Sequence, residues 1–286
     1  MSKTAQERAT RKFFCIGKLL LGYTAKPLRE ERHALPYFKH RLHQTNDKMS
    51  AHICTIPSAT VTQAMAAAGT DAVIIDMEHG AVGYPEAHAM IAATHGTNCA
   101  PLVRIAVTDT ALVKRVLDLG AEGIVFPLIR TAEDAQRAVS SMRYPPKGTR
   151  GFGPFIAHSR WDAPLTGYPA EMEDNQTCCL LVETADAVEN IEEICAVEGI
   201  DLLVPAMFDL STDLGLMGQF DHPDLLAAMA KVEAAAKAAN IPLGNAALNE
   251  AQAKAIFDRG YRVIAGFDLL WLKEKAAQAQ SWCAGD

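Results

Sequence analysis

The stretch with the clearest chemical potential is Asp76-Met77-Glu78-His79-Gly80, which directly follows the apolar run Ala72-Val73-Ile74-Ile75. Such a run is typical of a buried strand. Two carboxylates and an imidazole at its end could cap a surface turn, or they could belong to a site. Histidine is the side-chain type that titrates near neutral pH, so His79 is the natural candidate for a general base.

Other polar side chains stand at the ends of other apolar runs. Arg104 ends one such run, Glu183 ends a second, and Asp209 follows a third. Glu183 and Asp209 are carboxylates without a matching Cys or His cluster. Hard oxygen ligands of this kind suit Mg²⁺ or Mn²⁺, with water and substrate oxygens completing the coordination. Arg104 could bind a carboxylate or an enolate oxygen through parallel hydrogen bonds.

The composition of this set favours metal chemistry over imine chemistry. None of the strand-end residues is a lysine, which a Schiff-base aldolase would need. Each residue also has a structural alternative, because Asp209 could cap a short helix and Arg104 could pair with a neighbouring carboxylate. The catalytic interpretation therefore depends on a fold that brings these side chains to one place.

The elements that must position these side chains alternate along the chain after residue 50. β-Branched or Leu-rich runs are separated by Ala-rich stretches of helical period, such as 109–119. Gly69 and Gly120 end two of the helices in the manner of C-terminal caps. The expected strands are 52–56, 72–76, 101–105, 122–126, 179–183, 202–206, 241–245 and 262–266. Eight strand–helix units predict a (β/α)₈ TIM barrel, in which active sites form at the C-terminal ends of the strands.

An open, doubly wound sheet is the alternative fold. No GxGxxG motif follows the first expected strand, which argues against a dinucleotide-binding version of that fold. The alternation is interrupted at residues 144–178, which are irregular and carry Arg150, His158, Arg160 and Trp161. Long loops inside compact domains are usually functional or disordered. We therefore expect this segment to be functional and to lie over the mouth of the barrel.

Length and charge suggest two regions, a basic N-terminal extension over residues 1–48 and the barrel domain over 49–286. Residues 1–50 contain 11 basic and 4 acidic side chains, whereas the remainder contains 16 and 30. This contrast favours an extension packed against an acidic body. A phosphate-binding arm or a targeting segment remains an alternative, but the extension has no apolar core or cleavage signal of a secretory type.

Composition excludes several classes of function. The net charge of −7 argues against general affinity for nucleic acid. The sequence has no uncharged apolar run of about 18 residues, so we expect no membrane span. The 7 cysteines are odd in number and form no CxxC pair, which is typical of reduced thiols in a cytoplasmic protein.

Five stretches of the sequence occur in an order that identifies a family. They are Asp76–Gly80, Pro101–Arg104, Val116–Ala121, Tyr144–Gly151 and Val197–Asp201. Over roughly residues 50–275 the chain resembles the HpcH/HpaI aldolase family, which consists of class II, metal-dependent pyruvate aldolases. The resemblance implies a 2-oxo acid (pyruvate) and an aldehyde as the small-molecule partners.

The resemblance also implies a role for each site residue. Glu183 and Asp209 match the ligands of a divalent metal, Mg²⁺ or Mn²⁺, with Co²⁺ also possible. His79 matches the catalytic base, and Arg104 matches the residue that binds pyruvate and stabilises its enolate. Asp118 matches an aspartate that supports the histidine. Because Asp118 is expected on the lower rim, it could act only in a neighbouring subunit, and the family's hexamers, trimers of dimers with swapped C-terminal helices, imply a homo-oligomer.

Two positions depart from the family's pattern. Leu181 stands where the family usually has Gln, and Ala206-Met207-Phe208 precedes Asp209 where Gly-Pro is usual. Both changes remove polarity or alter shape on the substrate side. Leu181 and Phe208 are therefore expected to contact substrate and to change which substrate is preferred.

The implied reaction is the reversible cleavage of a 4-hydroxy-2-oxo acid to pyruvate and an aldehyde. One alternative is an oxaloacetate-type decarboxylation that forms the same enolate by losing CO₂. The other is a non-catalytic protein that binds a metal and a 2-oxo acid. The products separate the first two possibilities, and pyruvate binding without turnover would favour the third.

Overall fold

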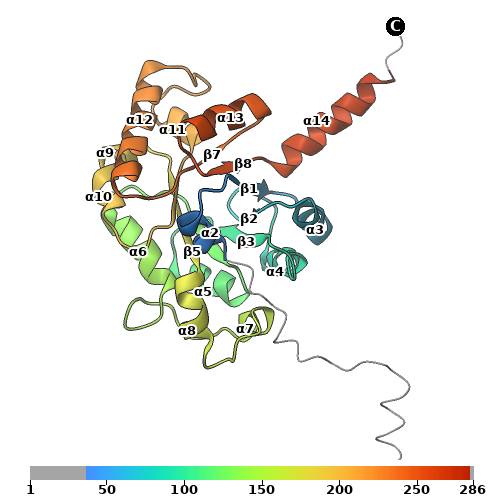
Figure 1. Ribbon diagram of the computed structural model, residues 1–286, viewed down its shortest axis with the longest axis vertical. Helices are drawn as coiled ribbons and strands as arrows, with labels where there is room; N and C mark the ends of the chain where they lie inside the picture. The colour runs from blue at the N-terminus through green and yellow to red at the C-terminus, as the bar shows by residue number, and fades with distance from the viewer. Residues whose placement is uncertain (1–36, 284–286) are drawn as a thin grey trace, which may run out of the picture. The chain divides into compact units, whose positions relative to one another are not determined.

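Eight parallel strands form the centre of the computed structural model, which describes residues 37–283 (Figure 1). The strand order is β6-β5-β4-β3-β2-β1-β8-β7, and a parallel bridge between Leu203 and Leu243 brings the two edges together. The predicted (β/α)₈ barrel is therefore confirmed. The strands are β1 (Met49–Cys54), β2 (Ala72–Asp76), β3 (Ala100–Arg104), β4 (Gly123–Phe126), β5 (Thr177–Val182), β6 (Leu202–Pro205), β7 (Gly244–Ala246) and β8 (Val263–Ala265).

The helices follow the strands along the chain, except α2, which precedes β1. They are α2 (Phe38–Gln44), α3 (Ala59–Ala67), α4 (Tyr84–Ala93), α5 (Thr110–Asp118), α6 (Ala132–Met142), α7 (Ala157–Arg160), α8 (Tyr168–Met172), η1 (Glu173–Asn175), α9 (Ala185–Glu189), α10 (Ile191–Cys195), α11 (Met207–Asp213), α12 (Pro223–Ala238), α13 (Glu250–Asp258) and α14 (Asp268–Ser281). The helix expected over 109–119 is confirmed as α5. Its N-cap residue Asp109 accepts hydrogen bonds from two backbone N–H groups, and Gly120 after its end has a φ of 102°, a conformation that favours glycine.

The strands are buried on both faces, as expected for a parallel sheet covered by helices. On β2, Val73 and Ile75 belong to the outer core between sheet and helices, whereas Ala72 and Ile74 belong to a separate inner core. Successive strand side chains point to opposite faces. Ile74 and Asp76 are two residues apart on β2, so both side chains point into the barrel, and Asp76 lies nearer the C-terminal end of the strand.

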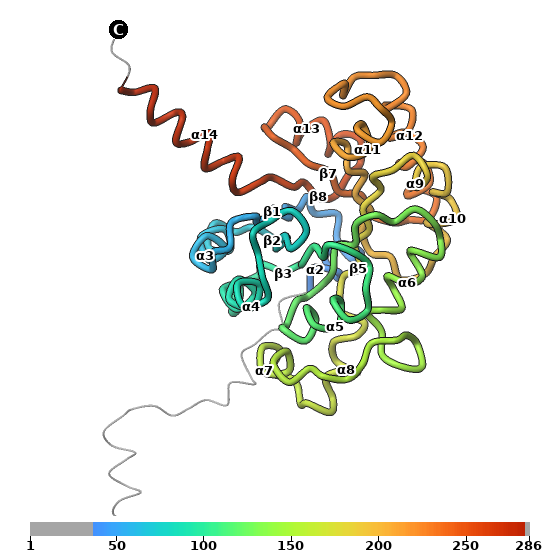
Figure 2. Tube along the Cα trace, turned by 180° about the vertical axis from the view of Figure 1, so that it is seen from behind, coloured from blue at the N-terminus to red at the C-terminus, as the bar shows by residue number. Residues whose placement is uncertain are grey.

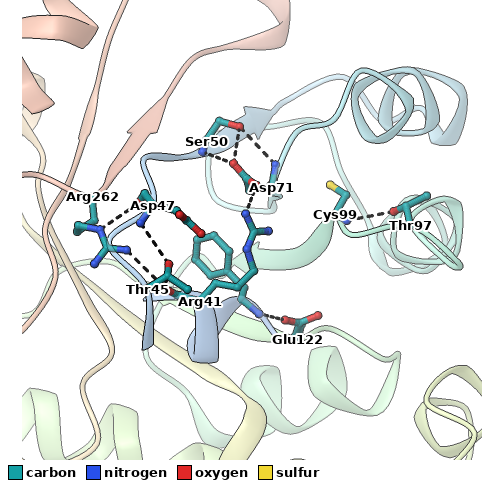
Figure 3. A network of polar contacts seen from close by, with 10 residues as sticks. Arg41, Thr45, Asp47, Ser50, Asp71, Thr97, Cys99, Glu122 and Arg262 are labelled. Atoms are coloured by element: carbon teal, nitrogen blue, oxygen red, sulfur yellow. Dashed lines mark hydrogen bonds and ion pairs between the residues drawn. The ribbon is translucent and has the colours of Figure 1, made fainter. Parts of the chain in front are cut away.

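Helix α2 closes the N-terminal end of the barrel. Phe38 and Leu42 are almost fully buried within the inner core. Arg41 forms an ion pair with Asp71, and Glu122 accepts a 2.7 Å hydrogen bond from the backbone N–H of Phe38 (Figure 3). The described part of the barrel unit therefore includes a helix that the sequence pattern placed in the extension. The rest of that expected extension, residues 1–36, lies outside the described residues.

The segment 144–178 lies at the opposite end of the barrel from the one we expected. It connects the C-terminal end of α6 to the start of β5, so it belongs to the N-terminal face of the sheet. Arg150 is fully buried there, and Arg160 donates to the carbonyl of Ile91 and the hydroxyl of Thr94 at the end of α4. The prediction that this segment covers the mouth is wrong. Its position follows from chain order, because a loop that precedes a strand cannot lie at that strand's C-terminal end.

Helix α14 extends away from the barrel in both views (Figures 1 and 2). Its first residue, Asp268, is buried, but Leu269, Leu270 and Leu272 are 55%, 49% and 59% exposed.

Within residues 37–283, no helix combines the length and the apolar character that a membrane span would need. Five of the six described cysteines are buried, and all six are free thiols.

Candidate active site

A buried ion pair links the ends of two neighbouring strands. Arg104, at the end of β3, donates from Nε to Oδ1 of Asp76 at 2.9 Å and from Nη2 to Oδ2 at 2.5 Å. The two residues are register partners on β2 and β3. Burial alone would raise the pKa of Asp76, but hydrogen bonds from Arg104 and from the backbone outweigh that effect and hold it below its usual range. Asp76 therefore stays ionised and fixes the Arg104 guanidinium.

The same carboxylate positions the turn that carries His79. Oδ1 of Asp76 accepts from the backbone N–H groups of Glu78 at 3.0 Å and His79 at 3.2 Å. Asp is well suited to such a turn because its short side chain reaches the backbone two residues on. The His79 side chain is 65% exposed, and its Nε2 lies 3.6 Å from Oε2 of Glu78. The imidazole thus stands at the solvent side of the mouth, where it can exchange a proton.

Two carboxylates from later strands face the same mouth. Glu183, which directly follows β5, and Asp209, in the first turn of α11, both line a cavity of about 270 Å³ together with His79 and Glu78. Burial raises the pKa of Glu183, and the negative charges of Asp209 and Glu78 raise it further. One oxygen of Glu183 accepts a hydrogen bond from the backbone N–H of Leu128, which orients the carboxylate.

This group of carboxylates fits a hard divalent cation. Oε2 of Glu78 is buried without a hydrogen-bond partner in the described part of the chain, and its pKa is raised by burial. No three His, Cys, Asp or Glu side chains within residues 37–283 form a complete ligand set. Two carboxylates such as Glu183 and Asp209 leave coordination positions that oxygens of water and substrate would fill.

A second cavity, of about 300 Å³, continues from the mouth into the barrel. His79 and Asp209 line both cavities, so the two adjoin. Leu181 lines the second cavity, as expected from its position two residues before Glu183 on the same strand face. Phe208 also lines this cavity. Its ring packs edge-on against the ring of Phe220, with 5.2 Å between the ring centres. The lining of the two cavities, taken over the described residues, includes no lysine.

Asp118 lies apart from this mouth within one chain. It is the last residue of α5, at the N-terminal face of the barrel, and it pairs with Nη2 of buried Arg150 at 2.8 Å. The cation of Arg150 also packs over the ring of Tyr144, 4.6 Å from its centre. The expected position on the lower rim is confirmed, and a role in a neighbouring subunit's site stays a prediction.

Two contributing residues were noted at the end of the second expected strand but received no role from the sequence. Asp76 holds Arg104, and Glu78 lies 3.4 Å from Nη1 of Arg104. Both belong to the pentapeptide that also contains His79, so the signal was present. Asp268, the first residue of α14, has a structural role, because its carboxylate accepts hydrogen bonds from Thr55 and the backbone N–H of Ile56.

The fold and the position of these polar groups define a barrel protein with its site at the C-terminal face of the strands. Comparison with known proteins names the family. The sequence profile of the family described as HpcH/HpaI aldolase/citrate lyase matches residues 55–273. The chain belongs to this family and is an aldolase-type enzyme, a carbon–carbon lyase. The family depends in general on divalent metals.

Individual relatives agree with this assignment. The 2-dehydro-3,6-dideoxy-6-sulfogluconate aldolase of Pseudomonas putida is 36% identical over 77% of this chain and 86% of its own. The 4-hydroxy-2-oxovalerate aldolase of Novosphingobium aromaticivorans is 38% identical over 72% of this chain and 78% of its own. A crystal structure of a family member from Burkholderia cenocepacia is 32% identical, with a TM-score of 0.80, and the match covers 86% of this chain and 98% of that one.

Proposed function

We propose that the protein is a divalent-metal-dependent aldolase that reversibly cleaves a 4-hydroxy-2-oxo acid to pyruvate and an aldehyde. The observation that supports this proposal most is the Asp76–Arg104 pair at the same mouth as Glu183 and Asp209. The 4-hydroxy-2-oxovalerate aldolase of Novosphingobium aromaticivorans is 38% identical, and the substrate in its name is a 4-hydroxy-2-oxo acid.

Arg104 binds the 2-oxo acid. Asp76 accepts from Nε and Nη2, and Nη1 forms a 3.4 Å ion pair with Oε2 of Glu78 that lacks hydrogen-bond geometry, so Nη1 can still donate to a substrate oxygen. A guanidinium held in this way is already oriented, so binding costs little side-chain entropy. When bound, a divalent cation would polarise the 2-oxo group and stabilise the charge of the enolate. Glu183 and Asp209 would hold that cation.

His79 acts as the general base in cleavage. It takes the proton of the C4 hydroxyl, the C3–C4 bond breaks, and the aldehyde leaves. The electron pair of that bond remains on the pyruvate part as the enolate, whose C3 then takes up a proton. The 65% exposure of the His79 side chain suits this role, because the aldehyde must enter and leave from the solvent side. A positioned base commonly contributes about 10²–10⁴-fold to the rate.

The donor set favours Mg²⁺ or Mn²⁺, with Co²⁺ as a further candidate, because carboxylates are the ligands these ions prefer. The test is a panel of aldehydes incubated with pyruvate and each metal in turn, with aldol formation followed by NMR. We expect aldol formation that EDTA abolishes and that one of these ions restores. Full activity in the presence of EDTA would overturn the metal assignment.

Oxaloacetate decarboxylation is the second candidate reaction. It forms the same enolate but needs no base for a hydroxyl proton, and Leu181 removes a polar contact that a hydroxylated substrate could use. Release of CO₂ from oxaloacetate, with no aldol formed from pyruvate and any aldehyde, would favour it. Pyruvate binding without either reaction would contradict both candidate reactions.

We propose further that the enzyme is a homo-oligomer, a hexamer or trimer of dimers, in the cytoplasm. The exposed leucines of α14 support the first point, since an apolar stripe on an otherwise exposed helix is normally covered. The free thiols support the second, because disulfides are rare in the cytoplasm. Light scattering of the full chain and of a variant that lacks α14 tests the assembly. A monomer in both cases would contradict it.

A further inference from the structure

One carboxylate oxygen at the mouth, Oε2 of Glu78, lies between two groups that can donate hydrogen bonds. It is 3.4 Å from Nη1 of Arg104 and 3.6 Å from Nε2 of His79. The Glu78 side chain is 13% exposed, and this oxygen is buried without a hydrogen-bond partner among residues 37–283. Most buried polar atoms in native proteins have such a partner, so this exception calls for an explanation.

Arg104 does not depend on Glu78 for its orientation. Asp76 accepts two hydrogen bonds from the Arg104 guanidinium, at 2.9 and 2.5 Å, which fix its plane. The contact of Glu78 with Nη1 is longer, at 3.4 Å, and lacks hydrogen-bond geometry. The imidazole of His79 is therefore the neighbouring group whose orientation Glu78 can decide.

The backbone brings the Glu78 carboxylate and the His79 imidazole together. The two residues are adjacent, and their N–H groups both donate to Oδ1 of Asp76, at 3.0 and 3.2 Å. Both side chains line the cavity that also contains Glu183 and Asp209. Because one atom holds both backbones, rotation of the side chains alone is enough to complete a contact between them.

The charges around Glu78 favour a carboxylate beside an imidazolium. Burial raises the pKa of Glu78, whereas the positive charges of Arg104 and of a protonated His79 lower it. A carboxylate next to a histidine base stabilises the imidazolium that forms when the base takes up a proton. Glu78 therefore has the position and the charge to support proton transfer to His79.

The two nitrogens of the His79 ring then have different tasks. In a neutral imidazole one nitrogen carries a proton and the other is an acceptor. A hydrogen bond made by one nitrogen sets which of the two tautomers is present. Since Nε2 faces Glu78, we expect the proton on Nε2 and the acceptor at Nδ1.

We propose that Glu78 is the positioning residue of the general base: it holds the N–H of Nε2, so that Nδ1 of His79 takes the proton of the C4 hydroxyl. This inference rests on the proposed aldolase function and deepens it. In cleavage the O–H bond breaks, its proton bonds to Nδ1, and the electron pair of the C3–C4 bond stays on the pyruvate part. The imidazolium then releases the Nδ1 proton to water, and C3 of the enolate takes up a proton from water.

The distance between the two side chains is part of this proposal. Hydrogen bonds of catalytic groups often tighten when substrate binds. The 3.6 Å between Oε2 of Glu78 and Nε2 of His79 should therefore shorten to hydrogen-bond length in the complex with substrate.

A double-mutant cycle tests the role of Glu78. Glu78→Gln should lower kcat for aldol cleavage at least about tenfold and change the dissociation constant of pyruvate little, because a positioned base supplies about 10²–10⁴-fold. In a His79→Ala background the same substitution should change kcat by less than about twofold, since Glu78 then has no base to position. If the effects of the two substitutions multiply, Glu78 acts on another group and the proposal is overturned.

Two controls separate positioning from other roles. Glu133→Gln removes the same charge at an exposed position in the first turn of α6, and it should keep the wild-type kcat. Glu78→Gln should bind Mn²⁺ as the wild type does, measured by calorimetry. An affinity about tenfold weaker or more would make Glu78 a metal ligand and would overturn the proposal.

The same measurements distinguish this inference from the function on which it rests. If the wild type cleaves no 4-hydroxy-2-oxo acid with any of the three metals, the proposed function fails, and the role of Glu78 fails with it. If the wild type cleaves such an acid and Glu78→Gln cleaves it equally fast, only the role of Glu78 fails.

The tautomer of His79 gives a readout that does not depend on turnover. Solid-state NMR of Mg²⁺-loaded protein with ¹⁵N-labelled histidine, at about pH 9, observes neutral imidazoles. The signals of His79 are identified by their loss in His79→Ala. We expect the proton on Nε2 in the wild type and a larger share of the Nδ1–H form in Glu78→Gln, whose amide can donate to Nε2. A wild-type ring with its proton on Nδ1 would overturn the proposal.

Discussion

Arg104 and Asp76 form a bidentate ion pair across the ends of β3 and β2, with N–O distances of 2.9 and 2.5 Å. Asp76 is fully buried, and the Arg104 side chain is 12% exposed. Because Asp76 also accepts from the backbone of Glu78 and His79, one carboxylate orients both the substrate-binding cation and the proposed base. Asp76 therefore acts through other residues, as a positioning residue.

Asp76→Asn should raise the KM for pyruvate by about tenfold or more. Its effect on kcat should be smaller. The amide cannot accept two charge-assisted hydrogen bonds, so Arg104 loses its fixed orientation. Thermal unfolding should also show a loss of stability, because removing one partner of a buried pair commonly costs about 3–5 kcal/mol. Arg104→Lys should show the same increase in KM, because a lysine ammonium cannot form the two parallel hydrogen bonds that the guanidinium forms with Asp76. Unchanged KM in both variants would contradict the positioning role.

Glu183→Gln should weaken Mn²⁺ binding at least about tenfold, measured by calorimetry on the metal-free protein. The substitution removes one of the two direct carboxylate ligands and its charge, and excess metal should restore activity only in part. Asp186→Asn is a suitable control, since Asp186 is exposed on α9 three residues further along the chain. Equal metal affinity in Glu183→Gln and the wild type would show that Glu183 is not a ligand.

His79→Ala should lower kcat for aldol cleavage by about 10²–10⁴-fold and change pyruvate affinity little. Oxaloacetate decarboxylation has no hydroxyl proton to remove, so that reaction should be reduced much less. The comparison needs both rates and a pyruvate dissociation constant from the same protein preparation. An equal fall in the two reactions would mean that His79 binds a common part of the substrates.

Leu181→Gln should shift preference from less hydroxylated towards polyhydroxylated substrates. Leu181 is 6% exposed and lines the cavity near Asp209, where a Gln amide could donate to a substrate hydroxyl. An unpaired polar group against Leu181 costs about 1–3 kcal/mol, which corresponds to roughly 5- to 150-fold in kcat/KM. The measurement compares kcat/KM between a 2-keto-3-deoxy sugar acid and an unbranched 4-hydroxy-2-oxo acid. Efficient cleavage of the sugar acid by the wild type would refute the argument.

Glu122→Gln should stabilise the protein at pH 8 and change little at pH 4.5. Burial raises the pKa of Glu122 to about 7, from an ordinary value of 4.5, although the Phe38 N–H lowers it. The folded protein therefore retains a proton that the unfolded chain releases, so stability falls as pH rises from 4.5 to 7, by up to about 3 kcal/mol. The Gln side chain keeps an oxygen that can accept the hydrogen bond from the Phe38 N–H, but it carries no charge.

Denaturant unfolding at several pH values measures that prediction. The wild type should lose stability across the interval, and Glu122→Gln should show a flatter profile. Glu171→Gln, at an exposed position on α8, is the control and should keep the wild-type slope. Identical profiles for wild type and Glu122→Gln would show that Glu122 is not the titrating group.

The sequence by itself determined the barrel and most of its mouth. Strand and helix periods alternate eight times, and parallel strands joined by helices all end at one face. For that reason His79, Arg104, Glu183 and Asp209 could be assigned to one mouth from their positions after apolar runs. Leu181 could be placed inside the barrel for a similar local reason, since side chains on a strand alternate.

Only the tertiary structure decided the contacts between segments far apart in the chain. The pairing of Asp76 with Arg104 depends on the register of β2 and β3, which no local pattern encodes. The closure of the lower end by Phe38, and the burial of Arg150 against Asp118 in a segment expected at the mouth, depend on which surfaces meet. The cavity that continues from the mouth into the barrel depends on all eight strands together, because its volume is set by side chains that converge only once the barrel has closed.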